Sequence, residues 1–412
     1  MSTAPAQSPM AVTGIGLVTA AGRDTKETWS EITGATVPSS VRRPESMQGL
    51  PCDFAYAVDG LDVDAHLGGA IRLMDRFAQL AVIAAREAVA DAGLDPDTWD
   101  GSRVAVVIGS AHGGLRFYDE QQAILHERGA RRVSPKVAVL SVPNNAVSSV
   151  CMDLGARGPS LAVSTACASG TDAIGTALAW LRAGRCDIAV AGGAESLTSR
   201  VILASACQMR ALSTRVDDPA TACRPFDIDR DGFVVGEGSG LLVLEHPDHA
   251  RARGAAVRAH VAGYGSSNDA SSSVAPDENG AGIETALRAA LADADLSAAD
   301  IGHVNAHGTS TILNDLVESA ALHRVFGDSP LVTSTKPMTG HALGAAGGIE
   351  AALTALALQD QVVPATVNLR QQDPRVPIQT VTRTARPARF DCAASTSLGF
   401  GGHNAALMLT RA

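Results

Sequence analysis

Apolar runs of strand length alternate along this chain with alanine-rich stretches in which apolar residues recur at helical spacing. Between residues 171 and 181, apolar positions at i, i+3, i+4 and i+7 predict an amphipathic helix. The runs that we expect to form strands are residues 11–15, 104–108, 160–163, 259–263, 301–305 and 394–398. Because strands and helices alternate, the pattern predicts an α/β fold with buried, largely parallel sheets.

Part of this pattern occurs twice. An alanine-rich helix end, a strand that ends in Ala-His-Gly, and a small-residue turn before a helix follow one another in the same order in both copies. The matched segments are residues 86–94 with 288–296, 111–113 with 306–308, and 164–170 with 334–340. Alanine-rich sequence produces chance matches, but several in one order indicate an internal duplication.

The duplication predicts two related α/β halves, residues 10–255 and 256–410. If these halves pack about a pseudo-two-fold axis, equivalent loops meet at the junction. Cys167 from the first half then faces three residues of the second half, His307, Lys336 and His341. The repeat alone therefore predicts a composite site.

Cys167 lies among small residues between an expected strand and an expected helix, in Ser164-Thr165-Ala166-Cys167-Ala168-Ser169-Gly170. At a helix N-terminus, free N–H groups and the macrodipole favour an anion, so we expect a lowered thiol pKa and a nucleophilic role. The alternative is an inert, buried cysteine, which is the commoner case.

Two histidines occupy the duplicated loops. His307 ends a strand in Asn305-Ala306-His307-Gly308, and His341 follows Gly340 at a glycine-rich helix start. A helix N-terminus disfavours the imidazolium form, so a neutral hydrogen-bond donor is expected there. Near the C-terminus, Gly399-Phe400-Gly401-Gly402 predicts a turn whose N–H groups could complete an oxyanion hole with the N–H of Cys167. A β-bulge with a core phenylalanine is the alternative.

Composition excludes several classes of function. The 412 residues carry a net charge of -10, with 33 basic and 43 acidic side chains that are dispersed, so nucleic acid and anionic membranes are not expected partners. The seven cysteines form no CxxC pair or Cys/His cluster of metal-binding spacing, so no metal is expected. Residues 1–9 lack the features of a secretory signal and no membrane span is evident, so we expect a cytoplasmic location. A local patch for an acidic partner is one interpretation of Arg72, Arg76, Arg131, Arg132 and Lys136, and ordinary solvated charge is the alternative.

Taken together, these segments resemble the elongating β-ketoacyl-[acyl carrier protein] synthases of the thiolase superfamily. The resemblance covers nearly the whole chain and rests on the cysteine motif, both histidine motifs and the Gly399–Gly402 turn, together with Val12-Thr13-Gly14-Ile15-Gly16, Met74-Asp75-Arg76, Arg224-Pro225-Phe226-Asp227 and Asp231-Gly232-Phe233. It implies a thiolase-like α/β fold in which two duplicated halves form a layered αβαβα core.

The resemblance also implies a reaction and residue roles. An acyl group would pass from the phosphopantetheine arm of an acyl carrier protein to Cys167, and malonyl carrier protein would then lose carbon dioxide and extend the chain by two carbons. No bound cofactor is implied. The implied roles are catalysis for Cys167, His307, His341 and Lys336, oxyanion binding for Cys167 and Phe400, gating for Phe400, substrate binding for Thr309, Thr311, His112 and Gly401, and support for Glu350, Asp315 and Glu318.

Departures from the family pattern bear on the substrate. His112 stands where fatty-acid-elongating relatives usually carry an aliphatic residue near the acyl pocket, the usual residues before Pro276 are missing, and Ile312 replaces a common proline. If His112 faces the pocket, these changes favour a dedicated type II polyketide or polyene pathway. The alternatives are housekeeping fatty-acid elongation and, in another class, a non-catalytic chain-length-determining subunit. Expected partners are an acyl carrier protein and either a second copy or a chain-length-factor-like subunit.

Overall fold

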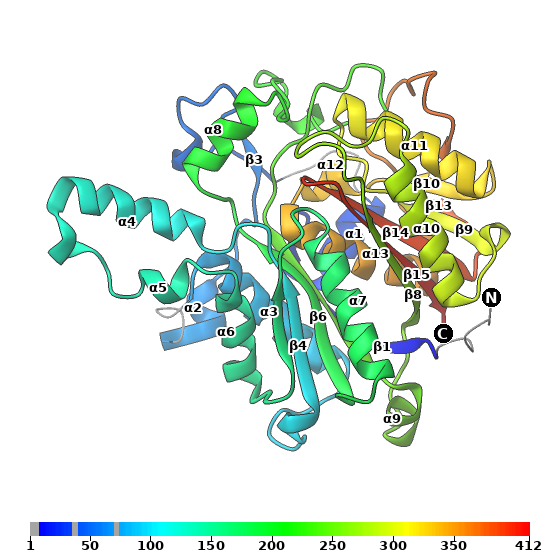
Figure 1. Cartoon of the computed structure of the whole chain (residues 1–412), viewed down its shortest axis with the longest axis horizontal. Coiled ribbons are helices and arrows are strands. Elements are labelled where there is room, and N and C mark those ends of the chain that lie inside the picture. Colours follow the sequence, from blue (N-terminus) through cyan, green and yellow to red (C-terminus); the bar gives the residue numbers. More distant parts are fainter. Residues whose placement is uncertain (1–7, 35–39, 70–73) are drawn as a thin grey trace.

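Two β-sheets of the same topology, joined edge to edge, form the centre of the molecule (Figure 1). The computed structural model describes residues 8–34, 40–69 and 74–412. The first sheet has the order β5-β4-β6-β7-β1, with β1 (Met10–Thr19), β4 (Val104–Gly109), β5 (Ser160–Val163), β6 (Ile188–Glu195) and β7 (Gly238–Glu245). The second has the order β10-β9-β14-β15-β8, with β8 (Ala259–Asn268), β9 (Ile301–Asn305), β10 (Leu331–Thr333), β14 (Cys392–Gly399) and β15 (His403–Arg411), and the short β12 (Gln379–Thr380) extends it beside β10.

The two sheets repeat one arrangement of strand directions. Strands β5, β4 and β6 of the first sheet pair in parallel, as do β10, β9 and β14 of the second. Strand β7 pairs antiparallel with β6 and β1, and β15 pairs antiparallel with β14 and β8. The first strands of the two halves, β1 and β8, pair antiparallel through residues 10–12 and 259–261 and so join the sheets. The prediction of largely parallel sheets is confirmed in strand direction: in each sheet four of the five named strands run the same way, and one is reversed. The reversed strands are β7 and β15, because each pairs antiparallel with both of its neighbours in its own sheet.

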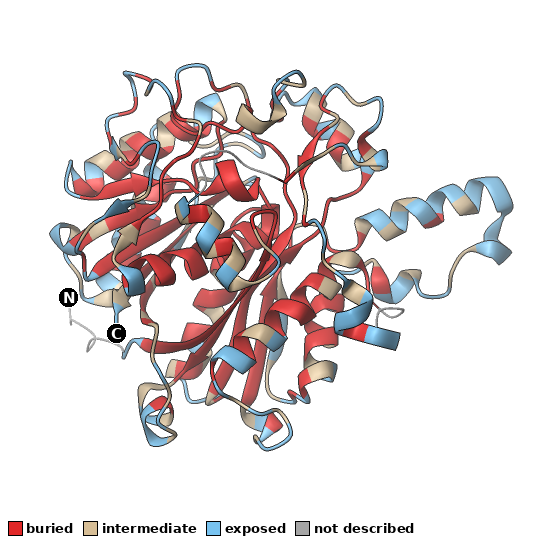
Figure 2. Cartoon of the chain, turned by 180° about the vertical axis from the view of Figure 1, so that it is seen from behind, coloured by how far each residue is buried: buried red, intermediate tan, exposed pale blue. Residues whose placement is uncertain are grey.

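Helices form three layers around the two sheets. Between the sheets lie α7 (Ser169–Arg182) and α13 (Ala346–Asp360), and every residue from Ala346 to Leu358 is buried. The outer face of the first sheet is covered by α3 (Arg76–Asp91) and α6 (Asn144–Leu154), and that of the second by α10 (Ala281–Ala294) and α11 (Ile312–Phe326). The chain thus has the expected αβαβα layering, and the buried residues fill the sheets and the helices between them (Figure 2).

Glycines allow the middle layer to pack this closely. A Cβ at Gly348 of α13 would lie 2.4 Å from the Gly240 carbonyl oxygen and 2.5 Å from the Gly193 nitrogen, so the helix backbone rests on β6 and β7. A Cβ at Gly170 of α7 would lie 2.7 Å from the Gly348 nitrogen. Backbone contact between α7 and α13 therefore brings the start of each helix to the same place.

The edge strand β5 differs from its prediction. Its apolar run predicted a buried strand, but Ser160 and Leu161 are exposed and Ala162 and Val163 are half-buried. The reason is that β5 pairs on one side only, with β4, and forms the edge of the sheet. Exposed apolar side chains also occur nearby in sequence, on α6, where Met152 is 69% exposed.

The remaining elements surround this core, and α4 with α5 projects as an exposed arm (Figures 1 and 2). They are α1 (Thr25–Gly34), β2 (Val41–Arg42), β3 (Ala55–Tyr56), α2 (Val63–Leu67), α4 (Leu115–Arg128), α5 (Val137–Leu140), α8 (Arg200–Gln208), α9 (Pro247–Ala252), α12 (Lys336–Thr339), β11 (Val362–Val363) and β13 (Arg386–Pro387). Within the described ranges, no helix combines the length and apolar character needed to cross a bilayer. Most of the N-terminal segment examined for a signal, and Arg72 of the basic patch, lie outside the described residues.

Candidate active site

Cys167 lies in the sharp turn between the edge strand β5 and the central helix α7. Ala166, just before it, has a φ of 51°, in the left-handed region that non-glycine residues rarely adopt. The Ser169 hydroxyl closes the turn, because its Oγ accepts from the Thr165 N–H at 2.9 Å and donates to the Ala166 carbonyl at 2.6 Å. The turn holds Cys167 just before the first turn of α7, where the residue is 8% exposed.

Burial keeps the thiol of Cys167 neutral in the free protein. It raises the pKa of Cys167 to about 12, while the nearby Lys336 ammonium and a hydrogen bond from the Phe400 N–H act in the opposite direction. The prediction of a lowered thiol pKa is therefore wrong for the unliganded site. The physical reason is that loss of water around the sulfur outweighs the neighbouring Lys336 cation.

His307 lies in the loop at the carboxyl end of β9. Its N–H and the N–H of Gly308 donate to the two carboxylate oxygens of Glu318 on α11, each at 2.8 Å. The hydroxyl of Thr396 on β14 donates to the same carboxylate at 2.7 Å. Glu318 is fully buried, and burial raises its pKa. This carboxylate therefore holds the backbone of His307 relative to both β14 and α11.

Asp315, one turn earlier on α11, supports the neighbouring part of this loop. Its carboxylate accepts from the Phe226 N–H at 2.8 Å and from the Ser310 N–H at 3.2 Å, and burial raises its pKa to about 6. The hydroxyl oxygens of Thr309 and Thr311 are 2.9 Å apart on either side of Ser310. Asp315 thus fixes the backbone from which both threonines project.

Lys336 is fully buried at the start of α12 and makes contact with His307. Its ammonium donates to the His307 carbonyl at 2.5 Å, lies 3.3 Å from His307 Nδ1, and forms an ion pair with Glu350 of α13. Because an ammonium cannot accept a hydrogen bond, Nδ1 is the acceptor and the proton of neutral His307 lies on Nε2. Burial raises the pKa of Glu350 to about 7, and Lys336 acts against that rise.

His341 lies between α12 and the 3-10 turn Leu343–Ala345 that leads into α13. Its N–H donates to the Val234 carbonyl at 2.7 Å, and its carbonyl accepts from the Gly236 N–H at 2.9 Å. The sequence placed His341 at a helix start, but the structure pairs it with residues 234–236, before α13 begins. Burial first and Lys336 second lower the pKa of His341 well below its usual value. His341 is therefore neutral, as the sequence predicted, but the cause is burial rather than a helix N-terminus.

Cys167 and the two histidines converge from the two halves of the chain. The Cys167 sulfur and one ring nitrogen each from His307 and His341 lie within 4.8 Å of one another. The imidazole rings are nearly perpendicular, at 82°, with centroids 5.2 Å apart. Burial, with Lys336 as the next cause, also lowers the pKa of His307 well below its usual value. The predicted meeting of Cys167 with His307, Lys336 and His341 is thus observed.

One cysteine and two histidines are also residue types that bind metal ions. Here the ammonium of Lys336, 3.3 Å from His307 Nδ1, places a positive charge beside the donor atoms and opposes a second cation. The same charge favours an anion or a developing negative charge at this place. The electrostatics of the trio therefore suit an oxyanion or enolate better than a metal ion.

The Gly399–Gly402 segment forms the tip of the β14–β15 hairpin rather than a bulge within a strand, since Gly399 pairs with His403. Phe400 is 43% exposed at this tip, and its N–H faces the sulfur of Cys167. Gly401, predicted to bind substrate, is not among the residues that line the cavity. Its N–H donates to the Ser273 carbonyl at 2.9 Å, and its carbonyl accepts from the Asn268 side chain at 2.8 Å.

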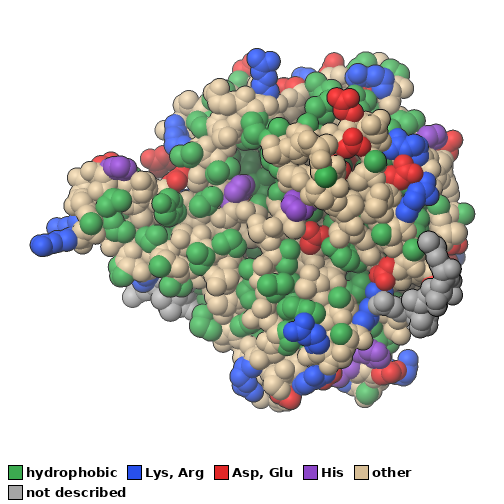
Figure 3. Space-filling model, viewed as in Figure 1, with side chains coloured by type: hydrophobic (Ala, Val, Ile, Leu, Met, Phe, Trp, Pro, Cys, Tyr) green, Lys and Arg blue, Asp and Glu red, His purple; other side chains and the backbone are tan. Residues whose placement is uncertain are grey.

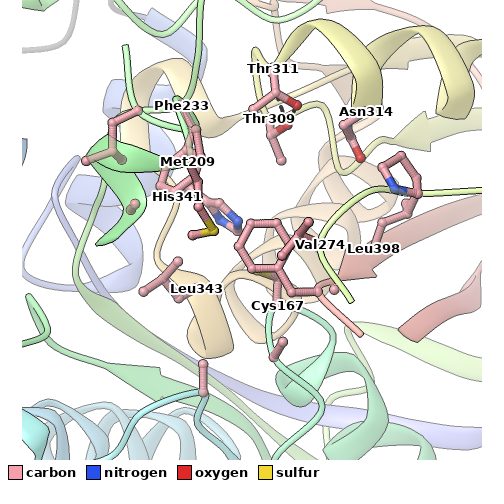
Figure 4. A pocket seen from close by; sticks show the side chains of 18 of the residues that line it. Cys167, Met209, Phe233, Val274, Thr309, Thr311, Asn314, His341, Leu343 and Leu398 are labelled. Carbon is pink, nitrogen blue, oxygen red and sulfur yellow. Dashed lines mark hydrogen bonds between the residues drawn. The ribbon is translucent and has the colours of Figure 1, made fainter. Parts of the chain in front are cut away.

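The trio opens into a cavity of about 710 Å³ with mainly apolar walls. Figure 3 shows a hollow on the corresponding face, and Figure 4 shows Cys167, His341, Thr309 and Thr311 around it. His112 also lines the cavity, and its Nδ1 is buried without a protein partner. Apolar lining comes from α8 and from the neighbours of His341, among them Ile202, Leu203, Ala206, Met209, Phe233 and Leu343.

Glu195 is a buried carboxylate that the sequence analysis missed. It ends β6 and accepts from the Ala111 N–H at 2.6 Å and from the Gly344 N–H at 3.3 Å. Burial raises its pKa to about 7, with a further hydrogen bond from the His112 N–H acting against the rise. Glu195 therefore fixes the loop that carries His112 against the segment after His341. The sequence does carry a signal for this residue, because Glu195 is a charged residue at the end of an otherwise apolar strand.

The sequence matches known family models and a related protein whose names fit the chemistry of this site. Residues 7–250 match the family model for the beta-ketoacyl synthase N-terminal domain, and residues 258–370 match that for the C-terminal domain. The chain is 40% identical over 405 residues to 3-oxoacyl-[acyl-carrier-protein] synthase 2 of Staphylococcus aureus (strain COL), with 97% of both chains covered. The chain belongs to the β-ketoacyl synthase family, whose members are acyl-transferring condensing enzymes, and the resemblance drawn from its motifs is confirmed.

Solved structures confirm the thiolase-like fold. The ishigamide ketosynthase/chain length factor aligns with a TM-score of 0.92 at 32% identity and covers 99% of this chain and 100% of its own. A ketosynthase bound to a hexaketide, in complex with its type II polyketide acyl-carrier protein, aligns with a TM-score of 0.86 at 30% identity and covers 98% and 100%.

The burial of neutral His341 predicts a stability difference that depends on pH. Because its pKa is lowered in the folded chain, below about pH 6.5 the unfolded state binds a proton that the folded state does not. Stability from this source is present above that pH and is lost as pH falls. Relative to wild type, His341→Asn should therefore gain up to about 1.4 kcal/mol in free energy of unfolding per pH unit below about 6.5, measured by urea unfolding.

The same pair of proteins supplies the control. Between about pH 7.5 and about pH 8.5, His341 is neutral in both states, so the difference in free energy of unfolding should be constant there. A difference that stays constant down to about pH 5 would contradict the neutral, buried state of His341.

Proposed function

We propose that this protein extends a carrier-bound acyl chain by two carbons through decarboxylative Claisen condensation, with Cys167 as the nucleophile. The single observation that supports it best is the meeting of the Cys167 sulfur with His307 and His341 nitrogens, within 4.8 Å of one another. These groups lie in a largely apolar cavity of about 710 Å³ that suits an acyl chain. Substrates arrive on phosphopantetheine, and no resident cofactor takes part.

The first step moves the acyl group to the protein. The Cys167 sulfur attacks the thioester carbonyl, the carbon–sulfur bond to pantetheine breaks, and the thiol proton passes to the leaving sulfur. Since burial keeps Cys167 a neutral thiol, its proton leaves as the acyl group arrives. The N–H groups of Cys167 and Phe400 stabilise the tetrahedral oxyanion.

The second step uses the histidines as donors. Malonyl carrier protein binds, its carbon–carboxylate bond breaks, and the electron pair becomes an enolate that attacks the acyl-cysteine carbonyl. His307 donates from Nε2, because Lys336 occupies its Nδ1. His341 is the second donor, and its buried Nδ1 has no protein partner. Release of carbon dioxide supplies the driving force, and the sulfur of Cys167 leaves as thiol or thiolate.

The acyl carrier protein is the proposed donor for both substrates. Thr309 and Thr311 line the cavity and offer hydroxyls to the pantetheine arm. Arg131 and Arg132 are exposed next to the α4 arm, and exposed Arg210 lines the cavity, so these cations could attract an acidic carrier. The complex of a related ketosynthase with its acyl-carrier protein supports this assignment. A cytoplasmic location stays a prediction.

The half-exposed edge of β5 supports assembly with a second chain. Leu161 on β5 is 43% exposed and Met152 on α6 is 69% exposed, which leaves apolar surface and unpaired strand hydrogen-bonding groups at one edge. The partner is a second copy or a chain-length-factor-like subunit. The related ketosynthase/chain length factor structure supports the second form.

Placement of His112 in the cavity wall favours a dedicated polyketide or polyene pathway over housekeeping fatty-acid elongation. A saturated alkyl chain cannot pair with an imidazole, whereas a carbonyl or hydroxyl on the chain can. Housekeeping elongation remains the second candidate because the S. aureus relative is a 3-oxoacyl-[acyl-carrier-protein] synthase 2. A non-catalytic subunit is disfavoured, since Cys167 sits in a complete arrangement of donors.

Replacing one histidine should separate the two steps. His341→Ala removes one donor to the enolate, so decarboxylation of malonyl carrier protein should fall about 10²–10³-fold while acyl transfer to Cys167 stays within about threefold. Intact-protein mass follows the transfer, and mass spectrometry of 3-oxoacyl product follows the condensation. His303→Gln, at a buried histidine that instead bonds to the Leu331 carbonyl, is the control and should slow neither step. Equal losses in both steps would argue against separate roles.

Replacing His112 should change the acyl preference. His112→Ile removes the imidazole from the cavity wall, so the ratio of kcat/KM for oxygenated over saturated acyl carriers should fall about tenfold, the cost of one lost hydrogen bond. The ratio is measured by competition between the two carriers, with His126→Ile on the exposed α4 arm as control. An unchanged ratio would support the housekeeping candidate.

A further inference from the structure

Asp172 is a carboxylate beside the nucleophile turn that none of the reaction steps above uses. It lies half-buried in the first turn of α7. Its Oδ2 accepts from the Thr165 hydroxyl at 2.5 Å, and its Oδ1 accepts from the Tyr264 hydroxyl at 2.7 Å. Thr165 is next but one to Cys167, whereas Tyr264 belongs to β8 of the other half. One carboxylate therefore connects the nucleophile turn to a strand of the second sheet.

The tip of the β14–β15 hairpin lies against the same turn. A Cβ added at Gly399 would come within 2.6 Å of the Thr165 carbonyl oxygen and 3.2 Å of the Cys167 nitrogen. The next residue of that tip is Phe400. The two N–H groups assigned to the oxyanion thus lie on separate elements, that of Cys167 on the turn before α7 and that of Phe400 on the hairpin. Both can reach one oxygen only if the turn keeps a fixed position relative to the hairpin.

Tyr264 is a firm anchor for this connection. A Cβ at Gly175 would lie 2.5 Å from its ring, so the ring rests on the backbone of α7. The Tyr264 N–H donates to Asp293 at 2.9 Å, and Asp293 pairs with Arg182 at the far end of α7 at 2.8 Å. Two carboxylates therefore tie α7 to β8, Asp172 at the Cys167 end and Asp293 at the other.

We propose that Asp172 is a positioning residue for acyl transfer: it holds the turn that carries Cys167 so that the N–H groups of Cys167 and Phe400 converge on one oxyanion. This inference rests on the proposed function. Removal of the carboxylate leaves the Thr165 and Tyr264 hydroxyls without their shared acceptor and frees the turn to shift. Oxyanion donors act over a narrow distance range of about 2.7–3.1 Å, so a shift of about 1 Å slows the reaction even when the thiol stays accessible.

Two reactions of Cys167 distinguish positioning from general damage. Acyl transfer passes through an oxyanion, whereas alkylation by iodoacetamide forms none. In Asp172→Ala, kcat/KM for acyl transfer should fall by between about tenfold and about a hundredfold, while the alkylation rate stays within about threefold of wild type. Asp293→Ala is the matched control, because it removes the other carboxylate that ties α7 to β8 and should slow neither reaction.

Tyr264→Phe is the second variant and keeps both the carboxylate and the ring. It should slow acyl transfer in the same direction as Asp172→Ala, and the double variant should be no slower than Asp172→Ala alone, because both changes break one connection. This variant tests the idea even if Asp172→Ala folds poorly.

Four outcomes would overturn the proposal. Normal acyl transfer in both Asp172→Ala and Tyr264→Phe removes the inference and leaves the proposed function intact. Parallel loss of acylation and alkylation, or an equal loss in Asp293→Ala, shows a structural role. If wild type itself accepts no acyl group at Cys167, the proposed function fails and this inference fails with it.

Discussion

The backbone contact between α7 and α13 is the constraint on which the site depends. The two helices lie between the sheets, and a Cβ at Gly347 would meet the Thr171 hydroxyl at 2.1 Å, while one at Gly170 would meet the Gly348 nitrogen at 2.7 Å. Any side chain there would separate the helices. Because α7 follows Cys167 and α13 follows His341, that separation would also move the nucleophile away from the histidines.

Burial sets the electrostatics of the assembled site. Cys167, His307 and His341 are all held neutral because water is excluded from them, and the Lys336–Glu350 ion pair supplies the nearest charges. Because the thiol and both imidazoles are neutral, none of them places a negative charge beside the oxyanion as it forms. The ammonium of Lys336 stabilises the negative charge that develops on the oxyanion or enolate.

The internal repeat predicted most of this arrangement, because equivalent turns of duplicated halves must meet at their common axis. It predicted that Cys167, His307, Lys336 and His341 meet at one site. The buried β5 and the lowered Cys167 pKa were predicted wrongly, since sheet edges and burial depend on tertiary context. Glu195 and Asp172 were missed for the same reason: each acts on residues far from it in the chain or in the other half.

Acylation of Cys167 tests the central claim most directly. Intact-protein mass is recorded after the protein is mixed with saturated, oxygenated and polyunsaturated acyl carrier proteins, in parallel with Cys167→Ala. The account predicts that wild type gains the mass of one acyl group, that Cys167→Ala gains none, and that oxygenated or polyunsaturated donors react fastest. A gain that persists in Cys167→Ala, or no gain in wild type from any donor, would contradict it.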